Sequence, residues 1–195
     1  MKYEDNIKAV AELQPDYMGF IFYKKSKRNF EGILPNLPDG IKKVGVFVDT
    51  SLEEINENIE KYGLQAVQLH GDESPEFCDH IKNVEVIKVF AIGKTFDFGT
   101  LKQYEDVCDY FLFDTKGKEK GGNGIVFDWN LLKNYSSKKP FFLSGGIGLE
   151  ELESIKDFSN SKLARYCYAL DLNSKFEDEP GLKNVEKLNY FKNNL

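Results

Sequence analysis

The stretch VGVFVDTSLEEINENIEKYGLQAVQL, residues 44–69, decides the fold class. It holds a short apolar run, a segment with helix start and stop signals, and a second apolar run. Ser51 and Glu54 form a capping-box pair at the helix start, and Gly63 is placed to end the helix. A strand, a helix and a strand joined by short turns predict one βαβ unit with parallel strands.

The same alternation continues on both sides of this stretch. Strands are expected at the β-rich apolar runs 17–22, 44–48, 66–69, 84–90, 110–113, 140–143 and 163–170. Most of these runs are apolar at nearly every position, which is typical of parallel strands buried on both faces. The regular repeat, together with glycine-rich turns late in the chain, favours a closed barrel over a doubly wound sheet.

A closed eight-stranded barrel needs one strand more than these runs provide. The chain opens with a predicted helix, residues 5–13, and an eighth strand would have to precede Met1. We therefore expect one α/β domain over residues 1–195, with the TIM (β/α)8 barrel fold lacking its first β-strand. The last helix is expected on the apolar stripe Leu182, Val185, Leu188, Phe191 and Leu195.

Composition excludes several classes of protein. The formal net charge of −6 gives no positive surface for DNA or RNA. No apolar run approaches the length of a membrane span, and no signal peptide is visible. Cys78, Cys108 and Cys167 form no CxxC pair, which argues against a disulfide framework and a zinc site. We expect a cytoplasmic protein with reduced thiols, no bound metal, and no membrane or nucleic-acid partner.

Three charged or titratable residues follow predicted strands. Arg28 lies just past the first strand and suits a bidentate clamp on a carboxylate, or else is a solvated loop charge. His70 ends the third strand, where barrel residues are often functional. Asp114 ends the strand Tyr110–Phe113 with no neighbouring countercharge in the strand, and burial there would favour a carboxyl that holds its proton. It is the candidate general acid, with a turn or cap role as the alternative.

Glycine and hydroxyl residues follow the late strands, where barrel loops often bind phosphate through backbone amides. The candidate substrate-binding residues in these turns are Gly122, Gly124, Gly145, Gly146, Asp171, Asn173 and Ser174. The acidic run Glu177-Asp178-Glu179 is interpreted as a solvated loop. Trp129 is expected to pack at a helix start.

Taken together, the chain resembles the phosphoribosylanthranilate isomerases of tryptophan biosynthesis. The matching segments are GFIF (19–22) with SKR (26–28), VGVFV (44–48), VQLHGDE (67–73), FDT (113–115), GGNG (121–124) with FDW (127–129), LSGG (143–146), and DLNS (171–174) with PG (180–181). They follow in order along almost the whole chain.

The resemblance implies the Amadori rearrangement of N-(5′-phosphoribosyl)anthranilate to 1-(2-carboxyphenylamino)-1-deoxyribulose 5-phosphate, with no cofactor, by a monomer or homodimer. It implies that Asp114 is the acid, that Arg28 binds the anthranilate carboxylate, and that His70 lies at the edge of that site. The two late turns, residues 145–146 and 173–174, would hold the phosphate, and Gly122 and Gly124 would lie in a closing loop.

The family's base is a cysteine in a Lys-x-Cys-Gly stretch at the end of the first strand, and none of the three cysteines matches it by position. We expect a natural protein about ten residues longer, and little or no turnover by the 195-residue form. Two alternatives remain open. One is an indole-glycerol-phosphate type of barrel, with Lys88 as its only good catalytic candidate. The other is a non-catalytic barrel fragment that binds sugar phosphate.

Overall fold

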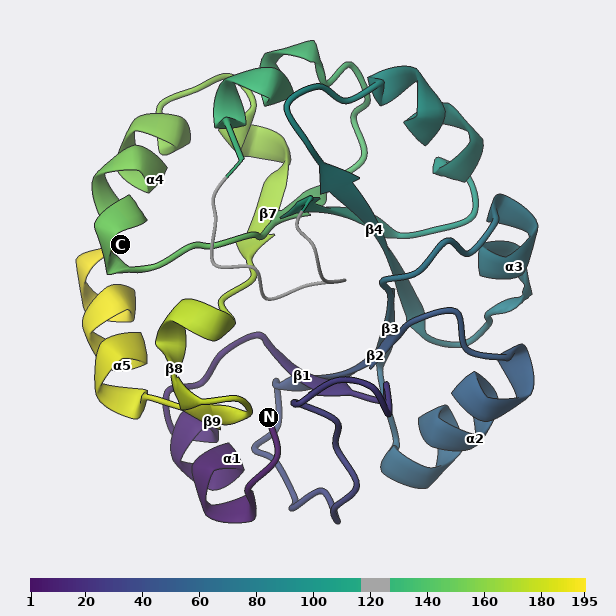
Figure 1. The fold of residues 1–195 in the computed structure, drawn as a ribbon, viewed down its shortest axis with the longest axis vertical. Coiled ribbons are helices and arrows are strands. Elements are labelled where there is room, and N and C mark those ends of the chain that lie inside the picture. Colours follow the sequence, from purple (N-terminus) through teal and green to yellow (C-terminus); the bar gives the residue numbers. More distant parts are fainter. Residues whose placement is uncertain (117–126) are drawn as a thin grey trace.

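A curled parallel sheet forms the centre of the molecule (Figure 1). The computed structural model describes residues 1–116 and 127–195. In these residues the sheet has seven strands that follow one another in chain order, all parallel. They are β1 (Tyr17–Ile21), β2 (Lys42–Phe47), β3 (Ala66–Leu69), β4 (Glu85–Ile92), β5 (Tyr110–Thr115), β6 (Phe141–Leu143) and β7 (Cys167–Leu170). The predicted strands and their parallel order are confirmed.

Helices surround the sheet, as Figure 1 shows. The α-helices are α1 (Glu4–Ala11), α2 (Leu52–Tyr62), α3 (Pro75–His80), α4 (Leu152–Ser159) and α5 (Val185–Asn194). Short 3₁₀ helices are η1 (Phe98–Tyr104), η2 (Trp129–Asn134), η3 (Leu149–Glu151), η4 (Ala164–Tyr166) and η5 (Ser174–Phe176). A small antiparallel hairpin, β8 (Glu177–Glu179) with β9 (Leu182–Lys183), precedes α5.

The predicted signals in the sequence set the helix ends. The hydroxyl of Ser51 accepts a hydrogen bond from the Glu54 amide at 3.2 Å, and Gly63 ends α2 with φ of 58°. Ser74 caps α3 in the same way, with Pro75 in the first turn. Each cap satisfies a backbone donor that the helix itself leaves unpaired.

Alternation along the strands divides the side chains into two sets. On β5, Phe111 and Phe113 point outward and pack in the core between sheet and helices, whereas Leu112 belongs to a separate cluster inside the sheet. Asp114 is two positions after Leu112, so it also points inward. A strand that is buried on both faces, such as β5, therefore has a continuous apolar sequence, and the polar residue at its end can still point into the interior of the sheet.

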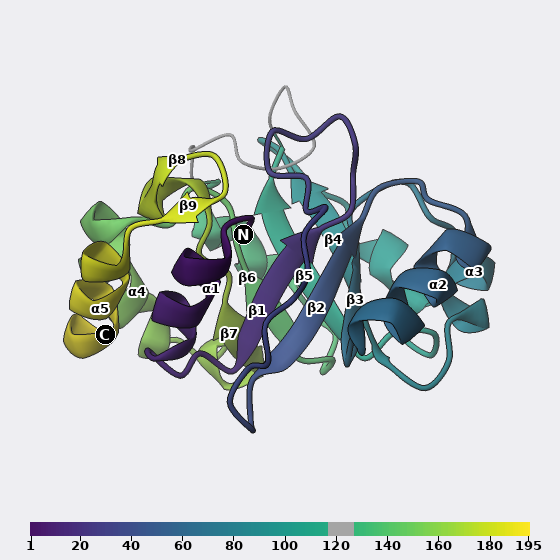
Figure 2. The same cartoon turned by 90° about the horizontal axis from the view of Figure 1, so that it is seen from below.

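The sheet is open between β1 and β7, each of which pairs with a single strand of the described chain. Helices α1 and α5 and the hairpin β8–β9 lie on that side (Figure 1). The hairpin and the loop after β1 lie at the same end of the sheet, the end to which the strands point (Figure 2).

Three local expectations were wrong. Residues 164–166, expected in the last strand, form η4, so Cys167 begins β7 rather than lying in its middle. Leu182 belongs to β9, and the last helix starts only at Val185, where Asn184 caps it. The segment Glu177–Glu179 is a strand rather than a solvated loop. In each case a short-range hydrogen bond decides the local structure. In η4 the amides of Ala164 and Tyr166 donate to the carbonyls of Ser161 and Leu163, and in the hairpin Glu177 and Glu179 pair with Lys183 and Leu182.

Candidate active site

One pocket of about 590 Å³ opens at the C-terminal ends of the strands and continues along the gap between β1 and β7. Every predicted site residue in the described part of the chain lines it: Arg28, His70, Asp114, Gly145, Gly146, Asp171, Asn173 and Ser174. Gly122 and Gly124 lie outside the described residues. The structure therefore brings together, in one cavity, groups that are up to 146 positions apart (Arg28 to Ser174) in the chain.

Asp114 and His70 contact each other inside this pocket. The Oδ2 atom of Asp114 lies 3.2 Å from Nε2 of His70, and Oδ1 accepts a hydrogen bond from the Thr115 amide at 2.8 Å. Asp114 was expected to have no countercharge within its own strand, and its partner His70 indeed comes from the end of β3; the sequence did not predict this contact. The Nδ1 atom of His70 lies 3.2 Å from the Gln68 amide nitrogen. This contact suits the imidazole tautomer in which Nδ1 accepts from the Gln68 amide and Nε2–H faces Asp114.

The turn after β6 packs tightly against Asp114. Gly145 and Gly146 have φ of 90° and 70°, in the region that favours glycine. A Cβ atom on Gly145 would lie 2.3 Å from Oγ1 of Thr115 and 2.9 Å from Oδ1 of Asp114. Only glycine therefore lets this backbone approach the candidate acid so closely.

A second carboxyl group, that of Asp171 after β7, faces the same pocket. The hydroxyl of Ser144 donates to Oδ2 of Asp171 at 2.9 Å. Burial raises the pKa of Asp171 above its ordinary value, the Ser144 hydrogen bond opposes this, and the nearby Asp114 raises it further. The site thus holds two carboxyl groups in different surroundings, one beside an imidazole and one beside a hydroxyl.

Arg28 forms a bidentate ion pair rather than standing free. Its Nε and Nη2 atoms donate to Oε2 of Glu177 at 2.8 and 2.6 Å, and Nε also lies 3.1 Å from Oε1. The interpretation of Glu177 as a solvated charge was wrong, since its side chain is 4% exposed. Pairing with β9 turns Glu177 inward, while Asp178 and Glu179 stay exposed.

Lys183 is a buried cation that sequence reasoning missed. Its Nζ atom donates to Oε1 of Glu177 at 3.2 Å and to both the backbone oxygen and Oδ1 of Asn173, at 3.0 and 2.7 Å. Burial lowers the pKa of Lys183, and Glu177 opposes this. Burial alone would raise the pKa of Glu177, but Arg28 and Lys183 hold it below its ordinary value. The pattern around Lys183 gives no sign of this role, because the hairpin itself was not predicted.

The three thiols do not offer a base to this pocket. Burial raises the pKa of Cys78 to about 11 and those of Cys108 and Cys167 to about 12. Cys167 lines the pocket, but at the first residue of β7, the end opposite to Asp114 on β5. In the described residues, no group of three or more His, Cys, Asp or Glu side chains is arranged to hold a metal ion.

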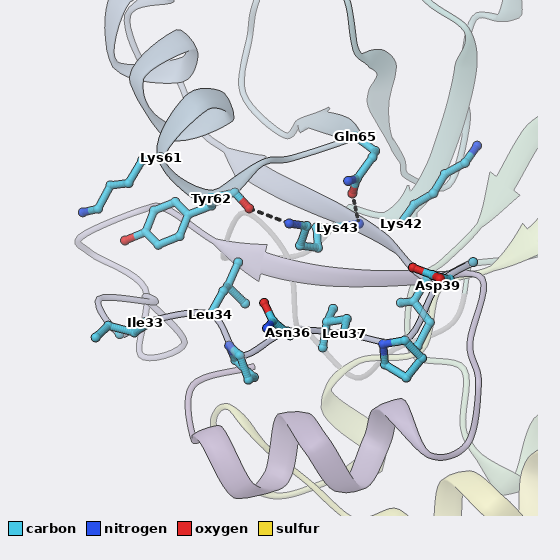
Figure 3. Close-up of a pocket in the computed structure, with 15 residues that line it drawn as sticks. Ile33, Leu34, Asn36, Leu37, Asp39, Lys42, Lys43, Lys61, Tyr62 and Gln65 are labelled. Carbon is cyan, nitrogen blue, oxygen red and sulfur yellow. Dashed lines mark hydrogen bonds between the residues drawn. The ribbon is translucent and has the colours of Figure 1, made fainter.

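A second hollow, of about 830 Å³, is lined by the loop between β1 and β2 and by the end of α2 (Figure 3). Its lysines already contact the protein: Nζ of Lys43 donates to the Tyr62 carbonyl at 2.7 Å, and Lys42 pairs with Glu85. None of the predicted site residues that the structure describes lines it. It holds no set of convergent polar groups that would compete with the strand-end pocket.

Lys88, the candidate of the indole-glycerol-phosphate alternative, does not line the strand-end pocket either. Its Nζ atom donates to Oε2 of Glu73 at 2.9 Å and to the Gly71 carbonyl at 2.7 Å, and the residue is 3% exposed. This buried ion pair leaves the lysine no access to a ligand in the pocket.

Comparisons with known proteins point in one direction. A family model described as N-(5'phosphoribosyl)anthranilate (PRA) isomerase matches residues 1–194. The N-(5'-phosphoribosyl)anthranilate isomerase of Parabacteroides distasonis is 42% identical over 98% of this chain and 88% of its own length. That of Phocaeicola vulgatus is 41% identical over 100% and 94%.

Solved structures agree. The phosphoribosyl anthranilate isomerase of Thermotoga maritima superimposes with a TM-score of 0.83, at 30% identity, over 100% of this chain and 94% of that one. A further isomerase structure, in complex with reduced 1-(o-carboxyphenylamino)-1-deoxyribulose 5-phosphate, has a TM-score of 0.76 at 30% identity and covers 95% and 90%. Within the described residues, no helix is long and apolar enough to cross a membrane.

Proposed function

Because the chain belongs to the N-(5′-phosphoribosyl)anthranilate isomerase family, we propose that it converts N-(5′-phosphoribosyl)anthranilate to 1-(2-carboxyphenylamino)-1-deoxyribulose 5-phosphate in tryptophan biosynthesis. This substrate carries a carboxylate at one end, a phosphate at the other and a ribose ring between them. The strand-end pocket offers a cationic group, glycine turns and a buried carboxyl group in one cavity, which supports that choice.

The contact between Asp114 and His70 carries the proposal. Asp114 gives a proton to the ribose ring oxygen, the bond from that oxygen to C1′ breaks, and the lone pair of the anthranilate nitrogen forms the C1′=N bond. His70 holds Oδ2 of Asp114 at 3.2 Å, and Thr115 holds Oδ1 at 2.8 Å, so the carboxyl group is oriented from both sides. The carboxyl group needs no cofactor for this step.

The second step removes the proton at C2′: the C–H electrons form a C1′=C2′ bond and the C1′=N electron pair returns to the anthranilate nitrogen. The resulting enol becomes the ketose when C1′ gains a proton and the C2′ hydroxyl loses one. In the family that this chain resembles, the base is a cysteine in a Lys-x-Cys-Gly stretch. Burial and position make Cys78, Cys108 and Cys167 unsuitable. We expect the 195-residue chain to bind its substrate and to turn it over slowly, because loss of one proton-transfer group typically costs about 10²–10⁴ in rate.

Arg28 is proposed to bind the anthranilate carboxylate, because Glu177 occupies Nε and Nη2 but not Nη1. The turns 145–146 and 173–174 are proposed to bind the phosphate, through backbone amides and the Ser174 hydroxyl. Gly122 and Gly124 remain predictions that rest on the resemblance alone, since they lie outside the described residues.

The test is the change of Asp114 to Asn, which keeps the shape of the side chain and removes the transferable proton. We expect turnover, measured by the change in anthranilate fluorescence, to fall by about 10²–10⁴. Affinity for the reduced product analogue, measured by calorimetry, is expected to change less than fivefold. Measurable and equal turnover of Asp114→Asn and the unchanged chain would refute the acid role. Binding of the analogue without any turnover by either would favour the non-catalytic alternative.

A further inference from the structure

A line of charged and polar side chains runs along one wall of the pocket, from Arg28 through Glu177 and Lys183 to Asn173. Every link has hydrogen-bond geometry, between 2.6 and 3.2 Å. The Glu177 and Lys183 side chains are 4% and 9% exposed, so this is not a solvated surface pair. The line begins at the residue proposed to bind carboxylate and ends in the turn proposed to bind phosphate.

The line has an unbalanced charge. Arg28 and Lys183 are cations, and Glu177 is the one anion in direct contact with both among the described residues. A buried excess of positive charge is costly unless an anion balances it. The lowered pKa of Lys183, caused first by burial, is in keeping with that cost. A bound ligand with two anionic ends would remove the imbalance.

The contacts also fix which atoms are left for a ligand. Glu177 engages Nε and Nη2 of Arg28, so Nη1 is the guanidinium nitrogen without a partner in the described chain. Lys183 can only donate, so it must face Oδ1 of Asn173, and the Asn173 amide nitrogen is left as a donor. A guanidinium N–H and an amide N–H are donors that suit a carboxylate and a phosphate oxygen.

We propose that Glu177 is a positioning residue that aligns Arg28 for the substrate carboxylate, while Lys183, which Glu177 contacts, holds Asn173 at the phosphate turn by its own hydrogen bonds. This rests on the proposed function. Glu177 touches no reacting atom in this scheme; it sets the spacing between the two anion-binding ends. The hairpin β8–β9 thus places the Glu177 carboxylate between Arg28 and Lys183. The Gly181 amide donates a further hydrogen bond to Oε1 of Glu177 at 3.2 Å.

The experiment measures dissociation constants by calorimetry for three probes. They are the reduced product analogue, the same compound with phenyl in place of carboxyphenyl, and inorganic phosphate. Glu177→Gln keeps the side-chain shape. We expect it to raise the dissociation constant of the full analogue at least tenfold, but that of the phenyl compound less than threefold. Lys183→Met should weaken both analogues and phosphate by the same factor, because they share the phosphate.

Glu179→Gln is the matched control. It lies in the same hairpin, is exposed, and contacts Tyr3 at the surface, so we expect less than a twofold change for every probe. Thermal unfolding checks that each variant is folded. Should Glu177→Gln not fold, Glu177→Asp keeps the charge but withdraws it by one methylene, and the same selective loss for the carboxylated probe is expected.

Two results would overturn the proposal. One is that Glu177→Gln leaves the affinity for the full analogue unchanged. The other is that it weakens the carboxylated and phenyl compounds by equal factors, which means that the hairpin is structural only. Failure of the unchanged chain to bind any probe is a different result, since it refutes the proposed function itself and this inference with it.

Discussion

The two walls of the pocket are built differently. In the closed wall, strands β2 to β6 each pair on both sides, and β3 is buried at every position. In the open wall, β1 and β7 pair with one strand each, and Gly19 and Tyr168 are exposed. The closed wall holds His70 and Asp114 by the geometry of the sheet. The open wall holds Arg28 and Asn173 by ion pairs and hydrogen bonds from a hairpin. In the proposed function, the acid Asp114 therefore belongs to the closed wall, and the anion-binding residues Arg28 and Asn173 belong to the open wall.

Adding a strand at the open wall, between β1 and β7, should have the largest effect on the rate of turnover. We expect that a chain extended before Met1 by a strand-forming segment ending in Lys-x-Cys-Gly turns over substrate about 10²–10⁴ times faster than the 195-residue chain. The same extension with alanine in place of that cysteine restores the strand without the base, and serves as the control. Fluorescence-monitored turnover measures both. Equal rates for the two extensions would show that the thiol is not the base.

Truncating one aromatic side chain on each wall compares their contributions to stability. Phe113 is fully buried behind β5, and Phe113→Ala is expected to lower the free energy of unfolding by about 3–5 kcal/mol. Tyr168 on β7 is 53% exposed, and Tyr168→Ala should cost about 1 kcal/mol. Urea unfolding monitored by circular dichroism measures both. Similar costs would mean that the open wall is as well packed as the closed one.

The smallest expected effect is a difference in pH dependence between two acids of the open wall. The pKa of Glu177 is lowered from 4.5 by folding, so its ionised form stabilises the protein above pH 4.5, and this is lost as the pH falls through the lowered value. The pKa of Asp171 is raised from 3.8, so its contribution is fully present below pH 3.8 and is lost as the pH rises through the raised value.

Substitution should therefore act in opposite directions at neutral pH. Glu177→Gln is expected to lower the free energy of unfolding and Asp171→Asn to raise it, with both differences shrinking towards acid pH. Urea titrations between pH 3 and 7 measure the two differences. A destabilising effect of Asp171→Asn at pH 7 would contradict the raised pKa.

The sequence predicted the closed wall well, because its signals are local. Continuous apolar runs marked the strands, Ser51 and Gly63 marked helix ends, and Asp114 was found because it directly follows such a run. The partner of Asp114 was missed, since the contact with His70 joins two strands and depends on how the sheet curls.

The open wall was predicted poorly, for a physical reason. The hairpin has only three residues in β8 and two in β9, too few for a period to show. Glu177 stands in an acidic run that looks solvated, and only the pairing with Lys183 turns it inward. Arg28 was found as a cation, but its bidentate partner is 149 positions away.

The alternation along β5 has a consequence for how this gene can change. Phe113 and Asp114 are adjacent yet face opposite sides, so inserting one codon before them would exchange their places. The phenyl ring of Phe113 would then point into the pocket, and the carboxylate of Asp114 would point into the apolar core between the sheet and the helices. Two inserted codons would restore the parity. Insertions and deletions are therefore tolerable in the loops. Within β5, an odd number of inserted residues would turn Asp114 away from the pocket, whereas an even number would keep it facing the pocket.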